Sequence, residues 1–420
     1  MRLSILISSV LVFGVATTGC DLLKRGQDKK DETQASSSSS TTSASSKPGD
    51  TTATTDTTAA AKPPSAGCTW PDGDPDHDVT ITKGCQVTVK NNVTVREGHS
   101  FTIEEGVKVS FDTDTYFWVE YGKLVIKGTD AQPVTFTSAN KSPAPGDWVG
   151  IGFQDKTMSG TSIDHLIVEY TGSKSANGEG ALRVEDMRQG GRISITNSTF
   201  RSSSQFGLVA GENATFAKFE NNTFKDNKSG SVKARAEVLG SFGRGNTFSQ
   251  PIHVDQSEVD QTTTWPPFDV PVLIDGNVSV GSDSSTPALS LGDKNTIKMG
   301  QDTYFAIGHN GSGALIAKNV TFTSASPAPS PGDWASVFLY GKSGTTDIEG
   351  CTFEYFGSTS GNANGAITLY ATSAKDLHNV TIQNNTFRKG KLQAMHSDDH
   401  ACAPYDKSNK VEGIPFCNKE

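Results

Sequence analysis

Carboxylate and imidazole side chains gather in two segments whose composition suits a metal ion. Four aspartates alternate with other residues near the start of the patterned region: Asp72, Asp74, Asp76 and Asp78. Alternating carboxylates on a loop suit calcium, although the distal bidentate glutamate of a complete calcium loop is missing. His396 and His400 flank two further aspartates, but an irregular loop at that spacing fixes no metal geometry. Calcium is the one cofactor that the sequence suggests, and the alternative for the aspartates is a solvated acidic loop.

Residues for cleaving a polysaccharide are harder to find. A glycosidase needs two carboxyl groups at a fixed separation, and no such pair stands out. Gly308–Gly311 contains His309, but no paired aspartates precede it. Arg201 and Arg388 each follow a Thr-Phe pair and could supply the base of a lyase, yet no acidic cluster adjoins either in the sequence. We predict no catalytic residue here, unless other parts of the fold bring carboxylates to these arginines.

Two pairs of aromatic residues form a candidate ligand face. Trp148 and Trp334 each end a Pro-Gly-Asp-Trp motif, and Tyr170 and Tyr355 each follow a glutamate further along the chain. An exposed tryptophan on a long β face offers a flat platform to a sugar ring. The alternative is that each indole covers an apolar strip beside the Gly-Asp turn.

Cysteine usage indicates an oxidising compartment. Cys68 and Cys85 flank the start of the patterned region, and Cys402 and Cys417 lie close together at its end. Each pair is predicted to form a local disulfide. Cys351 is left alone on an apolar strand, where we expect a buried free thiol.

The N-terminus has the features of an export signal. Arg2 precedes an apolar stretch, Leu3–Val15, which is short for a membrane span. Thr17-Thr18-Gly19-Cys20 follows, and it resembles the bacterial lipobox in its last two residues. The resemblance implies a signal peptide over residues 1–19 and acylation of Cys20, which would anchor the protein in a membrane.

Residues 20–66 are predicted to be a disordered tether. The segment is charged at first and then rich in Ser, Thr and Ala. Such a composition has too little apolar surface to offset the entropy lost on ordering. It would hold the folded part away from the membrane.

The rest of the chain has the pattern of a β-solenoid. Short runs alternate apolar and polar residues and end in Gly, Asn, Asp or Ser, and no stretch is long or periodic enough for a crossover helix. Phe200, Phe224 and Phe248 are 24 residues apart (224 − 200 = 24; 248 − 224 = 24). A period of this length with one aromatic per repeat is typical of stacked coils, in which phenylalanine packs on phenylalanine.

A longer duplication divides the solenoid into two homologous halves. Several motifs recur with offsets of 185 to 188 residues, among them Asp114–Phe117 with Asp302–Phe305, Thr135–Ala139 with Thr321–Ala325, and Pro145–Trp148 with Pro331–Trp334. We place the first half at 67–250 and the second, with a C-terminal cap, at 251–420. One continuous solenoid and two separate ones both fit this pattern.

Part of this pattern resembles a known superfamily. Gly128–Ser138, followed by the Pro-Gly-Asp-Trp motif at Trp148, is similar to bacterial right-handed parallel β-helix proteins of the pectate-lyase-like superfamily. The resemblance implies an all-β, right-handed parallel β-helix and is uninformative about activity. The combination of lipobox, tether and β-helix is similar to surface lipoproteins of myxobacteria.

Charge and architecture together limit the functions to consider. The formal net charge is −9 and no basic stripe is present, so a nucleic-acid partner is not expected. We interpret the chain as a non-enzymatic envelope lipoprotein of the outer membrane or cell surface. Its rigid solenoid would bind glycan or a partner protein. The alternative is a polysaccharide lyase or glycoside hydrolase acting on extracellular polysaccharide.

Overall fold

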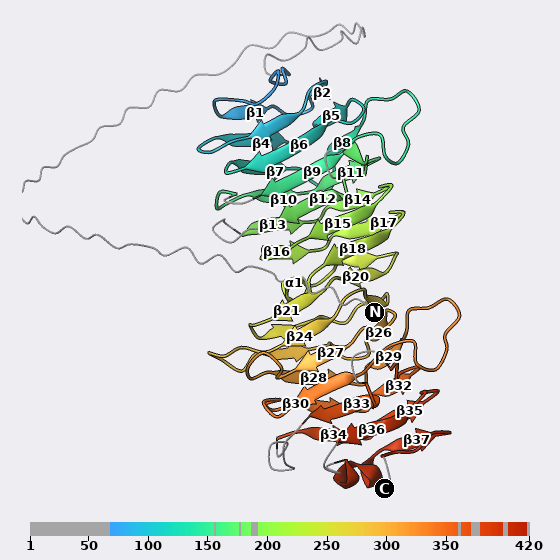
Figure 1. Cartoon of the computed structure of the whole chain (residues 1–420). Helices are drawn as coiled ribbons and strands as arrows, with labels where there is room; N and C mark the ends of the chain where they lie inside the picture. Colours follow the sequence, from blue (N-terminus) through green and yellow to red (C-terminus); the bar gives the residue numbers. More distant parts are fainter. Residues whose placement is uncertain are drawn as a thin grey trace, which may run out of the picture. The chain divides into compact units, whose positions relative to one another are not determined.

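Short strands in this protein pair in parallel with strands one coil further along the chain. A computed structural model describes residues 68–154, 157–175, 178–185, 192–359, 363–370, 379–397 and 402–417. These residues wind into a parallel β-helix (Figure 1), which confirms the predicted fold class. The predicted signal peptide, the acylated Cys20 and the tether lie outside the described residues. In the described part, no helix is long and apolar enough to cross a membrane.

Two sheets belong to the first half alone, and we call them sheets A and B. Sheet A consists of β1 (Val79–Ile81), β4 (Ser100–Glu104), β7 (Lys123–Lys127), β10 (Ser162–Asp164), β13 (Ile193–Thr196) and β16 (Phe216–Glu220). Sheet B consists of β2 (Gln86–Val89), β5 (Lys108–Phe111), β8 (Val134–Ser138), β11 (Leu166–Glu169), β14 (Thr199–Arg201), β17 (Thr223–Lys225) and β19 (Thr247–Phe248).

Sheet C runs through both halves. Its strands are β3 (Val93–Val95), β6 (Tyr116–Glu120), β9 (Gly150–Gln154), β12 (Gly180–Glu185), β15 (Phe206–Ala210), β18 (Gly230–Ala234), β20 (Ile252–Val254), β23 (Val272–Ile274), β26 (Thr296–Met299), β29 (Thr321–Ser324), β32 (Thr352–Glu354), β35 (Thr386–Arg388) and β37 (Lys410–Glu412). A single sheet that spans the duplication joins the two halves into one solenoid.

Sheets D and E belong to the second half. Sheet D consists of β21 (Ser257–Val259), β24 (Val278–Val280), β27 (Phe305–Ile307), β30 (Val337–Tyr340), β33 (Gly365–Tyr370) and β36 (Gln393–Ser397). Sheet E consists of β22 (Thr263–Thr264), β25 (Ala288–Ser290), β28 (Ala314–Lys318), β31 (Asp347–Glu349) and β34 (Thr381–Gln383). Two short helices complete the described fold: α1 (Ala236–Leu239) and the 3₁₀ helix η4 (Ala403–Ser408).

Alternation along each strand fills the interior of the solenoid. In β4, for example, Phe101 and Ile103 are fully buried while Thr102 between them is not. Phe200, Phe224 and Phe248 pair in register on neighbouring coils, with ring centroids 5.1 and 5.4 Å apart. The predicted phenylalanine ladder is therefore confirmed.

Stacked asparagine side chains form hydrogen bonds at the bend that precedes the stacked phenylalanines. Asn246 accepts a hydrogen bond from the Asn222 amide at 3.0 Å, and Asn222 accepts one from the Ser198 amide at 3.1 Å. Each side-chain oxygen thereby satisfies a backbone N–H that the bend leaves without a sheet partner. Asn221, just before the buried Asn222, has a φ of 56°, a left-handed conformation that asparagine tolerates well.

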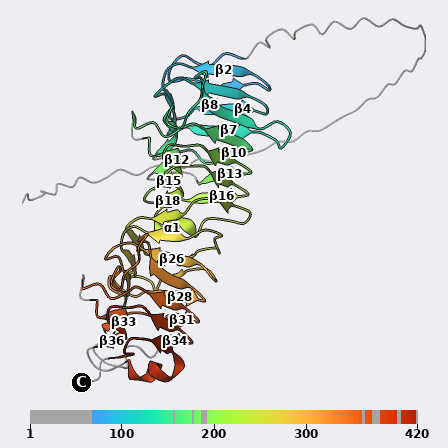
Figure 2. The same ribbon diagram turned by 90° about the vertical axis from the view of Figure 1, so that its right-hand side faces the viewer.

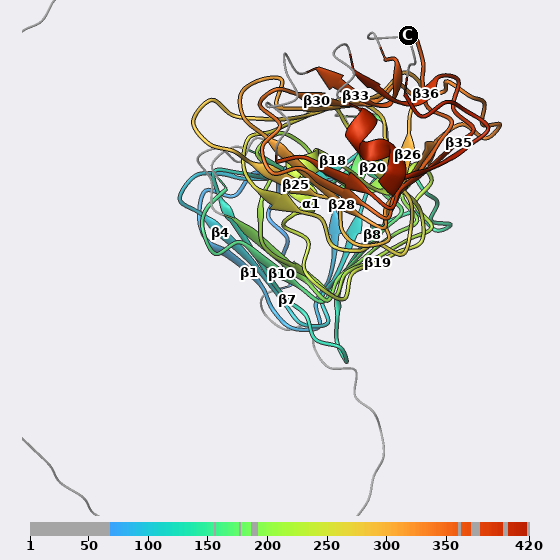
Figure 3. The same cartoon turned by 90° about the horizontal axis from the view of Figure 1, so that it is seen from below.

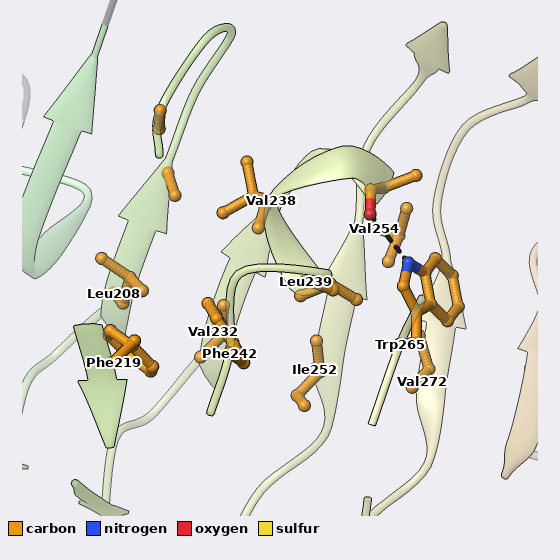
Figure 4. Close-up of a cluster of buried hydrophobic side chains, with 14 of the residues drawn as sticks. Leu208, Phe219, Val232, Val238, Leu239, Phe242, Ile252, Val254, Trp265 and Val272 are labelled. Atoms are coloured by element: carbon orange, nitrogen blue, oxygen red, sulfur yellow. Dashed lines mark hydrogen bonds between the residues drawn. The ribbon is translucent and has the colours of Figure 1, made fainter. Parts of the chain in front are cut away.

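A short helix interrupts the solenoid where the two halves meet. In chain order α1 takes the place of the next sheet A strand, and Gly243 just after it bonds to the carbonyl of Phe219 in β16 at 2.9 Å. Val238 and Leu239 of α1 are buried in the same cluster of apolar side chains as Trp265 (Figure 4). Trp265 donates from Nε1 to the Ala236 carbonyl at 2.7 Å, the dashed line in Figure 4.

Homologous strands of the two halves lie in different sheets. β8 of sheet B corresponds to β29 of sheet C, β9 of sheet C to β30 of sheet D, and β10 of sheet A to β31 of sheet E. Homologous faces nevertheless point the same way, because β12, β15 and β18 lie on the same side as β33 and β36 (Figures 1 and 2). In the view from below, β18 again lies toward the same side as β33 and β36 (Figure 3).

Disulfides close both ends of the solenoid. Cys68–Cys85 fastens the N-terminal segment, whose Trp70 packs on Phe101 with centroids 4.9 Å apart. Cys402–Cys417 fastens the C-terminal cap around η4. Both predicted disulfides are confirmed, and Cys351 is the buried free thiol that was expected. Burial raises the pKa of Cys351 to about 12, so the thiol is unreactive at neutral pH.

Candidate functional site

The two tryptophans of the predicted ligand face lie in the core. Trp148 and Trp334 are both 0% exposed. Trp148 stacks on Phe111 with centroids 4.1 Å apart and donates from Nε1 to the Glu169 carbonyl at 2.9 Å. Trp334 makes the equivalent bond to the Glu354 carbonyl at 2.7 Å. The prediction of an exposed tryptophan platform was therefore wrong at both positions, because each indole finds an apolar interior and a carbonyl partner there.

Arg201 lies in an ion pair on the outer face of sheet B. Its Nε donates to Glu169 at 2.7 Å, and Glu169 also accepts a bond from Thr137 at 2.9 Å. The three residues come from successive strands, so the coil supplies a carboxylate that the linear sequence hides. An arginine held this way is a poor general base, because the guanidinium would first have to lose a proton while it lies beside a carboxylate that favours its charged form.

The second half repeats this arrangement on sheet C. Arg388 donates from Nε to Glu354 at 2.8 Å and Thr323 donates to it at 3.0 Å. Lys389 adds a bond to the same carboxylate at 3.2 Å and another to the hydroxyl of Tyr355 at 3.1 Å. Burial by itself would raise the pKa of Glu354, but the bonds from Lys389, Arg388 and Thr323 outweigh it and lower that pKa.

Tyr170 and Tyr355 stand at corners of the solenoid. Each has a left-handed backbone, with φ values of 65° and 63°, and each is half-buried. Lys389 Nζ lies 4.9 Å from the ring centroid of Tyr355, within the range of a cation–π contact. With the tryptophans buried, these two tyrosines do not join them in a common ligand face.

The aspartates of the predicted calcium loop bond to separate partners. Their carboxylates accept from different groups: Asp72 from Asn91, Asp74 from Arg96, Asp76 from His77, and Asp78 from the Ser100 amide. Among the residues that the structure describes, no group of three or more His, Cys, Asp or Glu is placed to hold a metal ion. His396 contacts Gln393 at 2.9 Å, and His400 lies outside the described residues.

Aromatic side chains that the sequence analysis did not select lie on the outer face of sheet C. Trp118 of β6 lies beside Gly152 of β9 in register. A Cβ atom at Gly152 would be 3.1 Å from both Cδ1 and Nε1 of Trp118 and 3.3 Å from Cε2. Three nearly equal distances mean that the indole lies face-on over the glycine. Tyr116 packs beside it with centroids 4.8 Å apart.

Charged and amide groups surround this indole. Arg183 of β12 is in register with Gly152, and its Nη2 donates to Glu185 at 2.5 Å. Glu120, two residues beyond Trp118, accepts a bond from Arg96 at 3.0 Å and is in register with Gln154. A sugar ring has an apolar face and hydroxyl groups at its edge. A flat apolar ring bordered by carboxylate, guanidinium and amide groups is complementary to both.

The second half carries aromatic residues at the homologous place on sheet D. Phe338 of β30 lies in register with Ala306 of β27. Tyr304 and Tyr370 flank Phe338, with centroids 5.3 and 5.6 Å away, and Tyr340 stacks on Tyr370 at 5.2 Å. This cluster is separate from the interior core, and Phe338 itself is buried, at 2% exposed. The half-buried rings of Tyr304, Tyr340 and Tyr370 therefore form the accessible part of the cluster. Burial, and to a smaller extent the neighbouring Tyr370 and Tyr304, raise the pKa of Tyr340.

At these paired positions, the order of the large and the small residue is reversed between the two halves. Trp118 and Gly152 in the first half correspond to Ala306 and Phe338 in the second. Each pair therefore places one aromatic residue in register with one small residue on neighbouring strands. We call the set on sheets C and D the outer aromatic side: Tyr116, Trp118, Tyr304, Phe338, Tyr340 and Tyr370. The signal in the sequence is that these rings stand next to inward-facing residues, as Trp118 stands between the buried Phe117 and Val119.

A cavity of about 620 Å³ opens beside α1, where the two halves meet. Its lining includes carboxylates, arginines and hydroxyl groups, among them Glu212, Arg235, Glu237, Glu258, Asp260 and Thr264. Sequence reasoning missed this site because its residues come from separate coils.

Comparison with known proteins agrees with the fold. Residues 73–183 match the family described as "Pectate-lyase like beta helix domain". This match supports the parallel β-helix that the strand pairing shows. No match was found among curated proteins. A family defined by its fold assigns neither binding nor catalysis to this chain.

Proposed function

We propose that this chain is a non-enzymatic envelope lipoprotein that binds an extracellular glycan along its outer aromatic side. The observation that carries the proposal is the face-on packing of Trp118 over Gly152, with aromatic rings at the homologous place in the second half. A sugar ring can cover the outer face of the indole while its hydroxyl groups bond to nearby side chains. Stacked coils hold these groups rigidly, which reduces the ordering cost of binding.

The spacing of the two aromatic clusters favours an elongated ligand. β6 and β26 are seven strand spacings apart in sheet C, roughly 34 Å at ~4.8 Å per spacing. β27, which follows β26 directly, belongs to the second cluster. A polymer that lies along the solenoid would contact both clusters. Acylation of Cys20 and the tether would present this side at the outer membrane or cell surface.

Binding of a glycan array by the full chain and by three variants tests this proposal. Trp118→Ala should weaken binding about tenfold, which is ~1.4 kcal/mol, because the stacking surface is removed. Trp118→Phe should retain part of the affinity. Lys218→Ala, on the exposed face of sheet A, should change nothing. Equal binding by Trp118→Ala and the unaltered chain would overturn the assignment of this side.

A polysaccharide-cleaving enzyme is the second candidate, and the cavity beside α1 favours it. Glu237, Glu258 and Asp260 line that cavity together with Arg235, and acid and base groups on neighbouring coils are what such an enzyme needs. Incubation of any bound polysaccharide with the full chain, followed by assays for new reducing ends and unsaturated uronates, separates the two functions. Product formation would replace the binding proposal with catalysis.

A further inference from the structure

The cavity beside α1 occupies the one place, among the described coils, where sheet A ends and sheet D has not begun. Its volume of about 620 Å³ falls within the ~300–1,000 Å³ of small-molecule sites. α1 fills only the inner side of the missing strand position, since Val238 and Leu239 are buried. The outer side is left open as the cavity.

The floor of this cavity is held in place by buried hydrogen bonds. Trp265 donates to the Ala236 carbonyl at 2.7 Å, and Ser257 accepts a bond from the Ala236 amide at 2.8 Å. Trp265 itself is 1% exposed. The backbone that carries Glu237 is therefore fixed before any ligand arrives, which is the usual condition of a binding site.

Two buried polar atoms of the cavity lining have no hydrogen-bond partner within the described structure: Nδ2 of Asn213 and Oε2 of Glu237. The other oxygen of Glu237 accepts a bond from Arg235 Nε at 3.2 Å. A buried polar atom without a partner lowers the stability of the folded chain. A donor that enters with a ligand would remove this cost at Glu237, and an acceptor would do so at Asn213.

The charge of the lining selects the sign of the ligand. Carboxylates outnumber guanidinium groups by four to two: Glu212, Glu237, Glu258 and Asp260 against Arg192 and Arg235. Arg235 is already paired with Glu237. Burial raises the pKa of Glu237, outweighing its own backbone hydrogen bond and Arg235, while the charge of Asp260 acts in the same direction as burial. A cation placed between these carboxylates would favour their charged forms. It would thereby oppose the effect of burial and of Asp260 on the pKa of Glu237.

We propose that this cavity binds a small organic cation whose primary ammonium group bonds to Glu237 and whose neighbouring polar group bonds to Asn213. Thr264 and the carboxylates of Glu258 and Asp260 border the same space. An amino-sugar unit carries this chemistry, because its hydroxyl oxygens can accept a hydrogen bond beside the ammonium group. A protonated linear polyamine has donors alone, so it would bond to Glu237 and not to Asn213. The site is separate from the outer aromatic side, so it does not rest on the glycan-binding function.

Calorimetric titration of the full chain with three probes tests the proposal. The probes are a glucosamine trisaccharide with free amines, its N-acetylated counterpart, and spermidine. We expect the trisaccharide with free amines to bind, spermidine to bind more weakly because it has no acceptor for Asn213, and the N-acetylated sugar to bind at least tenfold more weakly than the free-amine sugar. Binding of the trisaccharide that is tighter than that of spermidine supports the pair of contacts, whereas equal or tighter binding of spermidine would overturn the role of Asn213.

Variants assign the binding to this cavity. Glu237→Gln keeps the size of the side chain and should weaken the amine at least tenfold, and Asp260→Asn should weaken it less. Trp118→Ala should leave amine binding unchanged, which separates this test from that of the glycan-binding function. Affinity should fall as the pH is lowered and Glu237 takes up a proton. The absence of binding by both amines, equal binding of the N-acetylated sugar, or full affinity in a folded Glu237→Gln protein would overturn the proposal.

Discussion

Glu354 shows how the solenoid gathers charges that are far apart in the sequence. Its carboxylate accepts from Thr323, 31 residues before it, and from Arg388, 34 residues after it. All three lie on neighbouring strands of sheet C. The Glu354 side chain is 12% exposed, so these bonds are less screened than those of a surface ion pair.

The Glu354 cluster should make stability depend on acidic pH. The pKa of Glu354 is lower in the folded chain than in the unfolded one, so its contribution is present above the unfolded pKa and is lost as the pH falls through the folded pKa. Glu354→Gln should lower the free energy of unfolding at neutral pH by about 1–2 kcal/mol and flatten its decline in acid. Urea denaturation across acidic and neutral pH measures both effects.

The exposed carboxylate of Glu97 provides the matched control for this measurement. Glu97→Gln should leave the stability curve within about 0.5 kcal/mol of the unaltered chain, as surface substitutions usually do. If the free energy of unfolding of Glu354→Gln fell in acid as steeply as that of the unaltered chain, other carboxylates would be responsible for the loss of stability.

At the scale of single elements, each strand depends on its neighbours one coil away. The strands have two to six residues, too few to be stable alone. Terminal coils have a neighbour on one side only, so they need a cap. Trp70 and Cys68–Cys85 provide it at one end, and η4 with Cys402–Cys417 provides it at the other.

Removal of the C-terminal disulfide should destabilise the last coils more than the rest. The loop between Cys402 and Cys417 is short, with a sequence separation of 15, and a disulfide of this size stabilises by about 3 kcal/mol. In Cys402→Ser/Cys417→Ser, amide exchange should accelerate in β35, β36 and β37 while β9 and β12 stay protected. Exchange followed by mass spectrometry reads each coil separately.

The other disulfide is the control for this effect. In Cys68→Ser/Cys85→Ser, exchange should accelerate in β1, β2 and β4 at the opposite end. If either pair of substitutions accelerated exchange evenly along the chain, the caps would not act locally and this account would be wrong.

At the scale of the whole molecule, one core passes through the junction of the two halves. The buried cluster is continuous from Val79 to Phe416, and sheet C crosses the junction without a break. At the junction itself sheets A and B end, so the coupling there relies on sheet C, α1 and Trp265. In a solenoid, a weak interface between two neighbouring coils allows the parts on either side of it to unfold separately.

Trp265→Ala should separate the unfolding of the two halves. Truncation of a buried tryptophan costs about 3–5 kcal/mol, and here the loss falls on the junction. We expect one thermal transition in the unaltered chain and two in the variant, measured by calorimetry. Trp148→Ala, which creates a comparable cavity inside the first half, is the control and should destabilise that half. A single lowered transition in Trp265→Ala would mean that sheet C alone couples the halves.

Several features could be predicted from the sequence because they depend on local periodicity. The period-two pattern of runs such as Phe101–Ile103 and the 24-residue spacing from Phe200 to Phe248 predict stacked coils, since a solenoid repeats the same inward position in each turn. The cysteine pairs were predictable because each closes a short local segment. The lipid anchor at Cys20 stays a prediction from its motif.

Other features were decided only by the tertiary structure. Trp148 and Trp334 are buried and Trp118 lies on the outside, a distinction that depends on which face of the coil closes on the interior. The carboxylate partners of Arg201 and Arg388 come from the preceding coil, some 30 residues away in sequence. The cavity beside α1 exists because a helix replaces a strand where two homologous halves join. The sequence therefore determined the repeating coil, whereas contacts between coils decided which side chains meet at its surface.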